Sequence, residues 1–231
     1  MRLDKYIANS TALSRKQVHR AVKSGEVCIN GKAVSKFSLT VAEGDKVTLD
    51  GAEIKRPGPR YFMLHKPKGY VCANKDEEHG TVIDLIHEVN SDKLQIAGRL
   101  DIDTSGLVLI TDDGQWNHRV TSPKKHCEKV YHVVCAEKID PSCIEQFKQG
   151  VQLESESQLT LPASLSIEEP GTQASLCIVE GKYHQVKRMF AAVGNHVNEL
   201  HRHSIGSITL DPTLAEGEYR PLNTAEINSI L

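Results

Sequence analysis

The residues best suited to chemistry lie in one polar turn, within the segment 98–111, which reads GRLDIDTSGLVLIT. The turn holds two carboxylates, Asp101 and Asp103, between Gly98 and Gly106, and an apolar stretch follows at once. Such a stretch is typical of a strand buried on both faces, so the polar groups would stand at the rim of a core. A carboxylate there can attack an electrophilic carbon or remove a proton, and can leave again afterwards. Short acidic side chains also cap turns, so a purely structural interpretation stays open.

The sequence shows no pattern that would hold a metal ion or a redox cofactor. Its six cysteines form no Cys-x-x-Cys pair and no grouping of zinc-finger spacing. A phosphate-cradling glycine loop and a dinucleotide-binding fingerprint are also absent. We therefore expect no cofactor and no metal, with the chemistry carried by side chains alone.

The elements that position this turn belong to an ordinary globular chain. Of its 231 residues, 39% are hydrophobic and 25% are charged. The N-terminus is charged from its start, and no stretch reaches the roughly 18 apolar residues of a membrane-spanning helix. We expect a cytoplasmic protein that does not engage membranes.

Charge is distributed unevenly along the chain. Residues 1–60 carry 12 Lys and Arg against 6 Asp and Glu, whereas the remainder carries 16 against 24. A small basic module before a larger acidic body suggests that the module binds a polyanion. The segment 51–60 has two prolines and two glycines, so we expect a linker there without helix or strand. We accordingly predict one domain over 1–58 and a second over 59–231.

The basic module is predicted to contain two helices followed by short strands. Ser14 and Gln17 form a capping-box signature at the start of the second helix, and Gly25 stands where a left-handed C-terminal cap belongs. The pair Asn30 and Gly31 is the strongest short-range signal for a tight hairpin. A further short strand is expected over 47–49.

This arrangement resembles the S4 RNA-binding module, through the segments RLDKYIA, SRKQV, VCINGK and EGDKV. The resemblance implies that the basic face of the second helix contacts RNA phosphates in a shape-directed, salt-sensitive manner. The residues expected to bind RNA there are Arg2, Arg15, Lys16, Arg20 and Lys23. The alternative is a basic helix that is merely solvated.

The larger domain alternates short apolar runs with turn residues. The expected strands cover 61–64, 106–111, 130–135, 174–179 and 208–210, and the expected helices cover 82–88, 141–149 and 184–193. Because the strands do not alternate strictly with long helices, we expect an α+β fold whose mixed, mostly antiparallel sheet carries helices packed on it.

Three motifs of this domain resemble those of one enzyme family. The segment 98–111 is similar to the signature of pseudouridine synthases that modify ribosomal RNA, and HKPKGY and GKYHQVKRM resemble two further motifs of that family. In the first of these, His65 stands where asparagine is commoner. An S4 module before a synthase domain, together with TDDGQWNHRVTSP and KRMFAAVGNHV, resembles the RsuA-type branch, which acts on small-subunit (16S) ribosomal RNA.

The resemblance implies a reaction that breaks the N1–C1′ bond of a uridine, turns the uracil and joins C5 to C1′. No atom is gained or lost, so neither a redox cofactor nor a metal is required. For the RsuA-type branch it also implies one target, the uridine conventionally numbered 516. The expected partner is ribosomal RNA, met in a partly assembled small-subunit particle by a monomeric enzyme.

The resemblance also implies roles for individual residues. Asp101 would be the essential catalytic residue, and Lys187 the cation that keeps a carboxylate at the rim of a core ionised. Tyr131 would stack on the extruded uracil and take part in proton transfer at C5, although a strand tyrosine usually packs in a core. Asp103 would point away from Asp101 in an extended backbone and satisfy the turn. The alternative for Lys187 is an ordinary surface charge.

Three further residues are predicted to contact RNA. Arg99 would fill the gap left by the flipped nucleotide or hold a flanking phosphate. Arg188 lies nearly opposite the apolar stripe of its predicted helix, and His184 begins that helix. Arg188 is therefore placed to meet RNA, unless it too is an ordinary surface charge.

Other functions are left open by the residues alone. One is a noncatalytic S4-type RNA-binding or ribosome-assembly factor, for which the first 60 residues would suffice. Another is a pseudouridine synthase acting on 23S ribosomal RNA. A third is a hydrolase using the two aspartates as a carboxylate pair, which lacks a separated acid partner.

Overall fold

The computed structural model describes residues 1–55 and 58–230, and the chain divides into two compact units. The smaller unit consists of Met1–Pro59 together with His87–Ser91, and the larger consists of Arg60–Ile86 and Asp92–Leu231. The sequence does not predict that residues 87–91 group with the smaller unit. The boundary between residues 58 and 59 stays a prediction. Arg56 and Pro57 of the predicted linker lie outside the described residues.

The smaller unit packs two helices on a four-stranded antiparallel sheet of order β2-β1-β3-β4. Its elements are α1 (Leu3–Ser10), α2 (Arg15–Lys23), β1 (Val27–Ile29), β2 (Lys32–Ala33), β3 (Val47–Leu49) and β4 (Ala52–Ile54). The predicted capping box is present, with both the Ser14 and the Gln17 side chain bonded to the other's backbone. The predicted hairpin also forms, since Asn30 and Gly31 both adopt positive φ between β1 and β2.

The expectation of a linker without strands over 51–60 is wrong at its beginning. Strand β4 pairs with β3 over Ala52–Ile54, and Asp50 and Gly51 make the connecting turn with positive φ. The prolines come only at 57 and 59, so nothing prevents hydrogen bonding over the preceding residues.

The larger unit is built on a nine-stranded sheet of order β13-β5-β7-β11-β8-β10-β9, with β6 beside β7 and β12 beside β11. The strands are β5 (Tyr61–Lys66), β6 (Gln95–Ala97), β7 (Ser105–Thr111), β8 (Lys129–Cys135), β9 (Ser164–Glu168), β10 (Gln173–Ile178), β11 (Val197–Ile205), β12 (Ile208–Thr209) and β13 (Tyr219–Pro221). Within the described residues every pair in this sheet is antiparallel except β7 with β11. The predicted mixed, mostly antiparallel α+β fold is confirmed.

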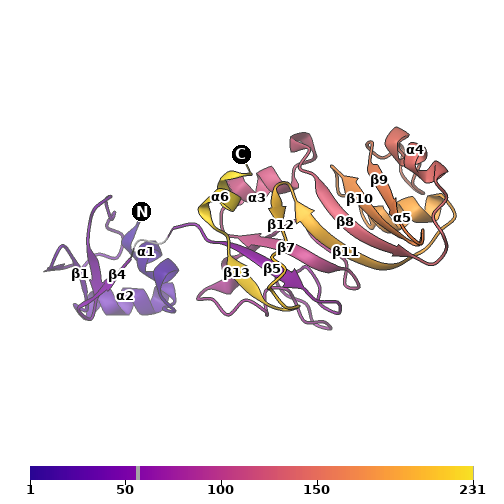
Figure 1. Cartoon of the computed structure of the whole chain (residues 1–231). Coiled ribbons are helices and arrows are strands. Elements are labelled where there is room, and N and C mark those ends of the chain that lie inside the picture. The colour runs from indigo at the N-terminus through magenta and orange to yellow at the C-terminus, as the bar shows by residue number, and fades with distance from the viewer. Residues whose placement is uncertain (56–57, 231) are drawn as a thin grey trace. The chain divides into compact units, whose positions relative to one another are not determined.

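The α-helices of this unit are α3 (Gly114–Thr121), α4 (Ser142–Gln149), α5 (Gln185–Ala192) and α6 (Thr224–Asn228), and two 3₁₀ turns cover Ser91–Lys93 and Pro123–Lys125. Figure 1 shows α3 and α6 near β12, and α4 and α5 near β9 and β10. Both faces of the sheet are covered, because successive residues of β7 belong to different apolar cores, Val108 and Ile110 to one and Leu107 and Leu109 to the other. Every residue of β7 is buried, as its sequence predicted.

One predicted helix is absent. Residues 82–88 form turns rather than a helix, with the Asp84 carboxylate accepting hydrogen bonds from the backbone N–H and hydroxyl of Thr81. Ile83 and Ile86 are both buried, so their spacing of three residues reflects one turn and not a continuing helical face.

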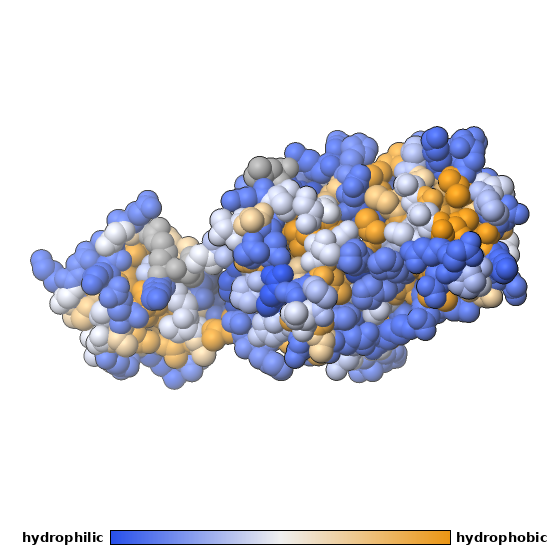
Figure 2. All heavy atoms as spheres, viewed as in Figure 1, coloured by the Kyte–Doolittle hydropathy of each residue, from blue (hydrophilic) through white to orange (hydrophobic). Residues whose placement is uncertain are grey.

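The visible surface is dominated by hydrophilic residues, with hydrophobic ones scattered between them (Figure 2). Among residues 1–55 and 58–230, no helix combines the length and the apolar character needed to cross a membrane.

Candidate active site

The turn that carries Asp101 sits at the start of the buried strand β7. The backbone N–H of Thr104 donates to the carbonyl of Asp101 at 3.1 Å and closes a β-turn. Strand β7 directly follows this turn and packs against an apolar core on each face, so it fixes the C-terminal end of the turn. The Asp101 side chain is 27% exposed, so its carboxylate is partly shielded yet accessible.

Two groups at the start of α5 face this carboxylate. Lys187 Nζ lies 3.7 Å from Asp101 Oδ2, and His184 Nε2 lies 3.4 Å from Asp101 Oδ1. His184 has a left-handed backbone, with φ of 46°, immediately before the helix begins. The structure thus brings Asp101 and Lys187 together. It also places His184, which was predicted only to contact RNA, next to the Asp101 carboxylate.

The expectation that Asp103 points away from Asp101 is wrong. Lys187 Nζ donates to Asp103 Oδ1 at 2.5 Å, so one ammonium group serves both carboxylates. The cause is the β-turn over residues 101–104, which replaces the extended backbone on which the expectation rested. Partial burial raises the pKa of Asp103, but the hydrogen bond and charge of Lys187 outweigh it and hold that pKa below its ordinary value.

Tyr131 lies on β8 and is only 7% exposed. Its phenol oxygen accepts a long hydrogen bond of 3.4 Å from Arg202 Nη1, and the Arg202 guanidinium carbon stands 5.9 Å from the ring centre. The phenol oxygen is thereby an acceptor on the arginine side. Its own hydrogen is free to point elsewhere, which suits a group meant to exchange a proton with a substrate.

Arg202 is a residue of this site that the sequence analysis missed. It is fully buried on β11, and its guanidinium donates to the carbonyls of Leu107 at 2.8 Å, Gly98 at 2.7 Å and Arg99 at 3.3 Å. No carboxylate in the described part of the chain lies within ion-pair distance of it. Three backbone carbonyls therefore balance a buried cation, and two of them belong to the segment that leads into Asp101.

Gly106 allows the backbone of Arg202 to lie close to strand β7. It pairs with Arg202 across the parallel β7 and β11 strands, and a Cβ on Gly106 would lie 2.3 Å from the Arg202 carbonyl oxygen. Gly98, at the other end of the motif, stands beside the guanidinium itself. Both glycines that flank the Asp101 turn thus adjoin Arg202. Their positions in the sequence are the one sign that another group packs closely against this turn.

Two more polar groups hold or face the turn. Lys66, fully buried on β5, donates to the carbonyls of Thr104 at 2.7 Å and Pro67 at 3.0 Å, and its burial lowers its pKa. The buried hydroxyl of Thr104 has no hydrogen-bond partner in the structure. A buried unpaired hydroxyl costs free energy, so Thr104 is a point of local strain next to the Asp101 turn.

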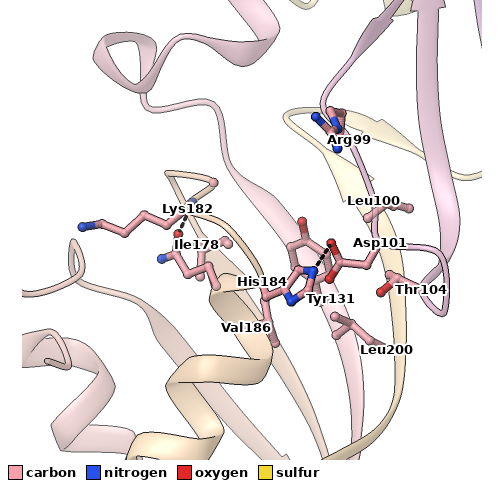
Figure 3. Close-up of a pocket in the computed structure, with 12 residues that line it drawn as sticks. Arg99, Leu100, Asp101, Thr104, Tyr131, Ile178, Lys182, His184, Val186 and Leu200 are labelled. Carbon is pink, nitrogen blue, oxygen red and sulfur yellow. Dashed lines mark hydrogen bonds and ion pairs between the residues drawn. The ribbon is translucent and has the colours of Figure 1, made fainter. Parts of the chain in front are cut away.

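One cavity of about 880 Å³ lies beside Asp101. Asp101, Tyr131, His184, Lys187 and Arg99 all contribute to its wall. Figure 3 shows Tyr131 behind the paired Asp101 and His184, with Arg99, two residues before Asp101, above them. The volume falls within the range of pockets that take small organic ligands, and its wall carries several polar groups.

Arg188 does not line this cavity, and its donors meet protein oxygens. The guanidinium contacts Glu156 Oε1 at 3.2 Å, the carbonyl of Tyr183 at 3.0 Å and the carbonyl of Glu154. Its predicted contact with RNA stays a prediction. His65, the unusual residue of the HKPKGY motif, bonds through Nδ1 to the carbonyl of Leu214 at 2.8 Å.

In the smaller unit, the predicted cations of α2 are exposed and make no ion pair within the part of the chain that the structure describes. They are Arg15, Lys16, Arg20 and Lys23. Arg2 differs, because its guanidinium pairs with the buried Asp4 carboxylate at 2.9 Å. The charge of α2 is therefore available to a polyanion, whereas that of Arg2 is partly neutralised.

Over residues 1–55 and 58–230, no group of three or more His, Cys, Asp or Glu side chains is placed to hold a metal ion.

Comparison with known proteins gives two family matches and close relatives. Residues 60–192 match the family model described as RNA pseudouridylate synthase, and residues 1–47 match that of the S4 domain. The chain is 52% identical over 232 residues to the ribosomal small subunit pseudouridine synthase A of Escherichia coli strain K12, covering all of both proteins. It is 51% identical over 231 residues to the protein of that name from Vibrio parahaemolyticus, covering 100% of this chain and 99% of the relative.

A solved structure described as a pseudouridylate synthase is similar over its whole length. The two chains share 44% identity with a TM-score of 0.72, and each is covered completely.

Proposed function

The chain belongs to the RNA pseudouridylate synthase family, and we propose that its substrate is one uridine of small-subunit (16S) ribosomal RNA. The relatives named as small-subunit synthases match it at about half of all positions along its full length, S4 module included. The proposed enzyme acts in the cytoplasm as a monomer, on RNA within a partly assembled small-subunit particle. By this proposal residues 1–58 bind RNA and residues 59–231 carry the chemistry.

Asp101 is the proposed catalytic residue. The single observation that carries this assignment is its carboxylate at the wall of the 880 Å³ cavity, within 4 Å of both Lys187 and His184. The reaction breaks N1–C1′ and forms C5–C1′, while C5 gives up a proton and N1 takes one. A carboxylate held by two neighbours can attack C1′, attack C6 or remove the C2′ proton, and each of these routes releases it afterwards.

Tyr131 and Lys187 complete the proposed catalytic group. Tyr131 lines the cavity, so an extruded uracil can stack on its ring, and its phenol oxygen accepts a hydrogen bond from Arg202, which leaves its own hydrogen for another partner. Lys187 supplies an ammonium group next to the two carboxylates, 3.7 Å from Asp101 Oδ2 and 2.5 Å from Asp103 Oδ1.

RNA is held by a second group of residues in this proposal. The free cations of α2 contact phosphates, while Arg99 and His184 contact the nucleotide or its neighbours at the cavity wall. Arg188 and Arg2 contribute less, since both already meet protein oxygens.

The test is a map of pseudouridine in ribosomal RNA from cells with and without this chain, by carbodiimide modification or mass spectrometry. We expect one site in small-subunit RNA to be lost and to return when the wild-type chain is restored. A lost site in large-subunit RNA or in transfer RNA would refute the proposed substrate. An unchanged map would favour a noncatalytic RNA-binding factor.

A further inference from the structure

Tyr183 is the most exposed large hydrophobic side chain among the described residues, at 75%. The next is Leu159, at 52%. A single exposed hydrophobic residue needs no explanation by itself. Tyr183 differs from the others because it lines the same cavity as Asp101, where the substrate must enter.

The Tyr183 ring is held in a defined orientation. It stacks on the His184 ring, with 3.8 Å between the ring centres and 19° between the planes. His184 is in turn placed against Asp101, with 3.4 Å between Nε2 and Oδ1. A continuous series of contacts therefore runs from the partly shielded Asp101 carboxylate through His184 to the exposed Tyr183 ring.

The backbone under Tyr183 is also fixed. Its carbonyl accepts a hydrogen bond from Arg188, and the N–H of the preceding Lys182 donates to Gln185 Oε1 at 2.8 Å. The Lys182 ammonium pairs with Glu156 at 3.0 Å. An aromatic ring on such a base presents its open face without a large loss of conformational entropy on binding.

We propose that Tyr183, backed by His184, is a stacking site for the base of a nucleotide adjacent to the target uridine. One face of the ring is covered by His184 and the ring is otherwise open to solvent, which leaves room for one base. The site is distinct from Tyr131, which is 7% exposed and lies inside the cavity. Aromatic rings beside a cationic groove bind single-stranded nucleotides in this manner, and Lys187 supplies charge nearby. The inference rests on the proposed function, because it takes the substrate to be RNA.

The first test compares the affinities of Tyr183→Phe, Tyr183→Leu and wild type for a small-subunit RNA fragment that contains the target. Stacking is lost in Tyr183→Leu, so we expect affinity to fall by roughly 5- to 150-fold, whereas Tyr183→Phe should stay within about twofold. Leu159→Ala is the matched control for removing an exposed apolar side chain, and it should bind as wild type does. The slope of log affinity against log salt should not change, because no charge is lost.

The second test identifies the base. Abasic nucleotides are placed one at a time on either side of the target uridine, and each RNA is measured with wild type and with Tyr183→Leu. At one position the two changes should together weaken binding no more than either alone, which shows that they remove the same contact. Additive losses at every flanking position, or wild-type affinity of Tyr183→Leu, would overturn the inference. Failure of the proposed function shows separately, as absence of pseudouridine in the fragment after incubation with wild type.

Discussion

The buried cations Arg202 and Lys66 near Asp101 donate their hydrogen bonds to backbone carbonyls rather than to carboxylates. Arg202 donates to Gly98 and Arg99, and Lys66 donates to Thr104, so the turn is held from both sides. A buried cation is costly unless its hydrogen bonds are made, and here the carbonyls make them without cancelling its charge. The surroundings of the turn stay positive, which favours both a carboxylate and an RNA phosphate.

The first prediction concerns Asp101→Asn, with Asp101→Ala as the harsher variant. An amide keeps the size and turn contacts of the side chain but is a far weaker nucleophile and base. The single-turnover rate should therefore fall by roughly 10³-fold or more. RNA affinity should stay within about threefold. The measurement is tritium release from C5-labelled uridine in target RNA, and near-wild-type release by Asp101→Ala would remove Asp101 from the mechanism.

A site residue could be predicted from the sequence only where a motif or a local pattern marks it. Asp101 and Lys187 could be identified through the resemblance of their motifs to those of the family. Neither their spacing nor the composition of the chain predicts that they lie close together. Asp103 was misplaced because the direction of a side chain depends on the local backbone, and a turn reverses what a strand would give. Thr104 gave no signal, since a free hydroxyl is visible only once every nearby donor has been placed.

The strands of the larger unit differ in how visible they are in the sequence. Strand β7 was predictable because an unbroken apolar run is buried on both faces. Strand β11 (VNELHRHSI) was missed although it lies in the middle of the sheet, because it buries Arg202 and Ser204 and so lacks the apolar alternation of an ordinary strand. Of these two buried polar residues, Arg202 also connects β11 to the segment that leads into Asp101.

The second prediction tests that connection through Arg202→Lys and Arg202→Met. Lysine keeps the charge but cannot reach three carbonyls with a planar fork, so the Asp101 segment and Tyr131 should lose their fixed positions. We expect single-turnover rates to fall by about 10²-fold or more for both variants, with RNA affinity little changed. Hydrogen exchange should become faster in the segment 98–104.

The control for this prediction is Arg220→Met, which removes another arginine with several hydrogen bonds, on β13. It should lower stability without changing the single-turnover rate or exchange in 98–104. If folded Arg202→Lys matches wild type in rate and exchange, Arg202 does not position the site.

The third prediction concerns the acid sensitivity of the joint between β13 and α6. Arg220 donates to both oxygens of Glu226 and to Asp211. These bonds lower the pKa of Glu226, and with bonds from Thr213 they hold the pKa of Asp211 at about 2. A lowered folded-state pKa stabilises the fold above the unfolded pKa, and this contribution is lost as pH falls through the folded value.

Arg220→Met should therefore lower Tm by roughly 2–4 °C at pH 7. The difference from wild type should shrink as pH falls from about 4.5 toward 2, where the carboxylates become protonated in both proteins. Thermal or urea unfolding across this range measures it. A difference that stays constant or widens on acidification would show that Arg220 stabilises by packing alone.

At the scale of the whole molecule, the two units have separate apolar cores. The apolar cluster of the smaller unit contains only residues up to Ile54, and the two clusters of the larger unit begin at Phe62 and Met63. The uneven charge and the prolines of the segment 51–60 predict a division of the chain in this region. The sequence does not indicate that His87–Ser91 group with the smaller unit, because that grouping depends on contacts distant in sequence, such as those of Asn90 with the carbonyls of Ala8 and Thr11.

The last prediction separates the two units by removing residues 1–58, beside a full-length variant with Arg15, Lys16, Arg20 and Lys23 changed to alanine. Each lost phosphate contact should flatten the slope of log affinity against log salt by about 0.7 to 0.9, so both proteins should bind structured RNA weakly and with a shallow salt dependence. Phosphate contacts position RNA without performing the reaction, so the single-turnover rate at saturating RNA should stay within several-fold of wild type. Filter binding across a salt series, with thermal unfolding alongside, provides the measurement. Unchanged affinity and slope in the alanine variant would mean that the basic face of α2 is only solvated, whereas loss of the cooperative unfolding transition in the shortened chain would mean that the larger unit needs the smaller one to fold.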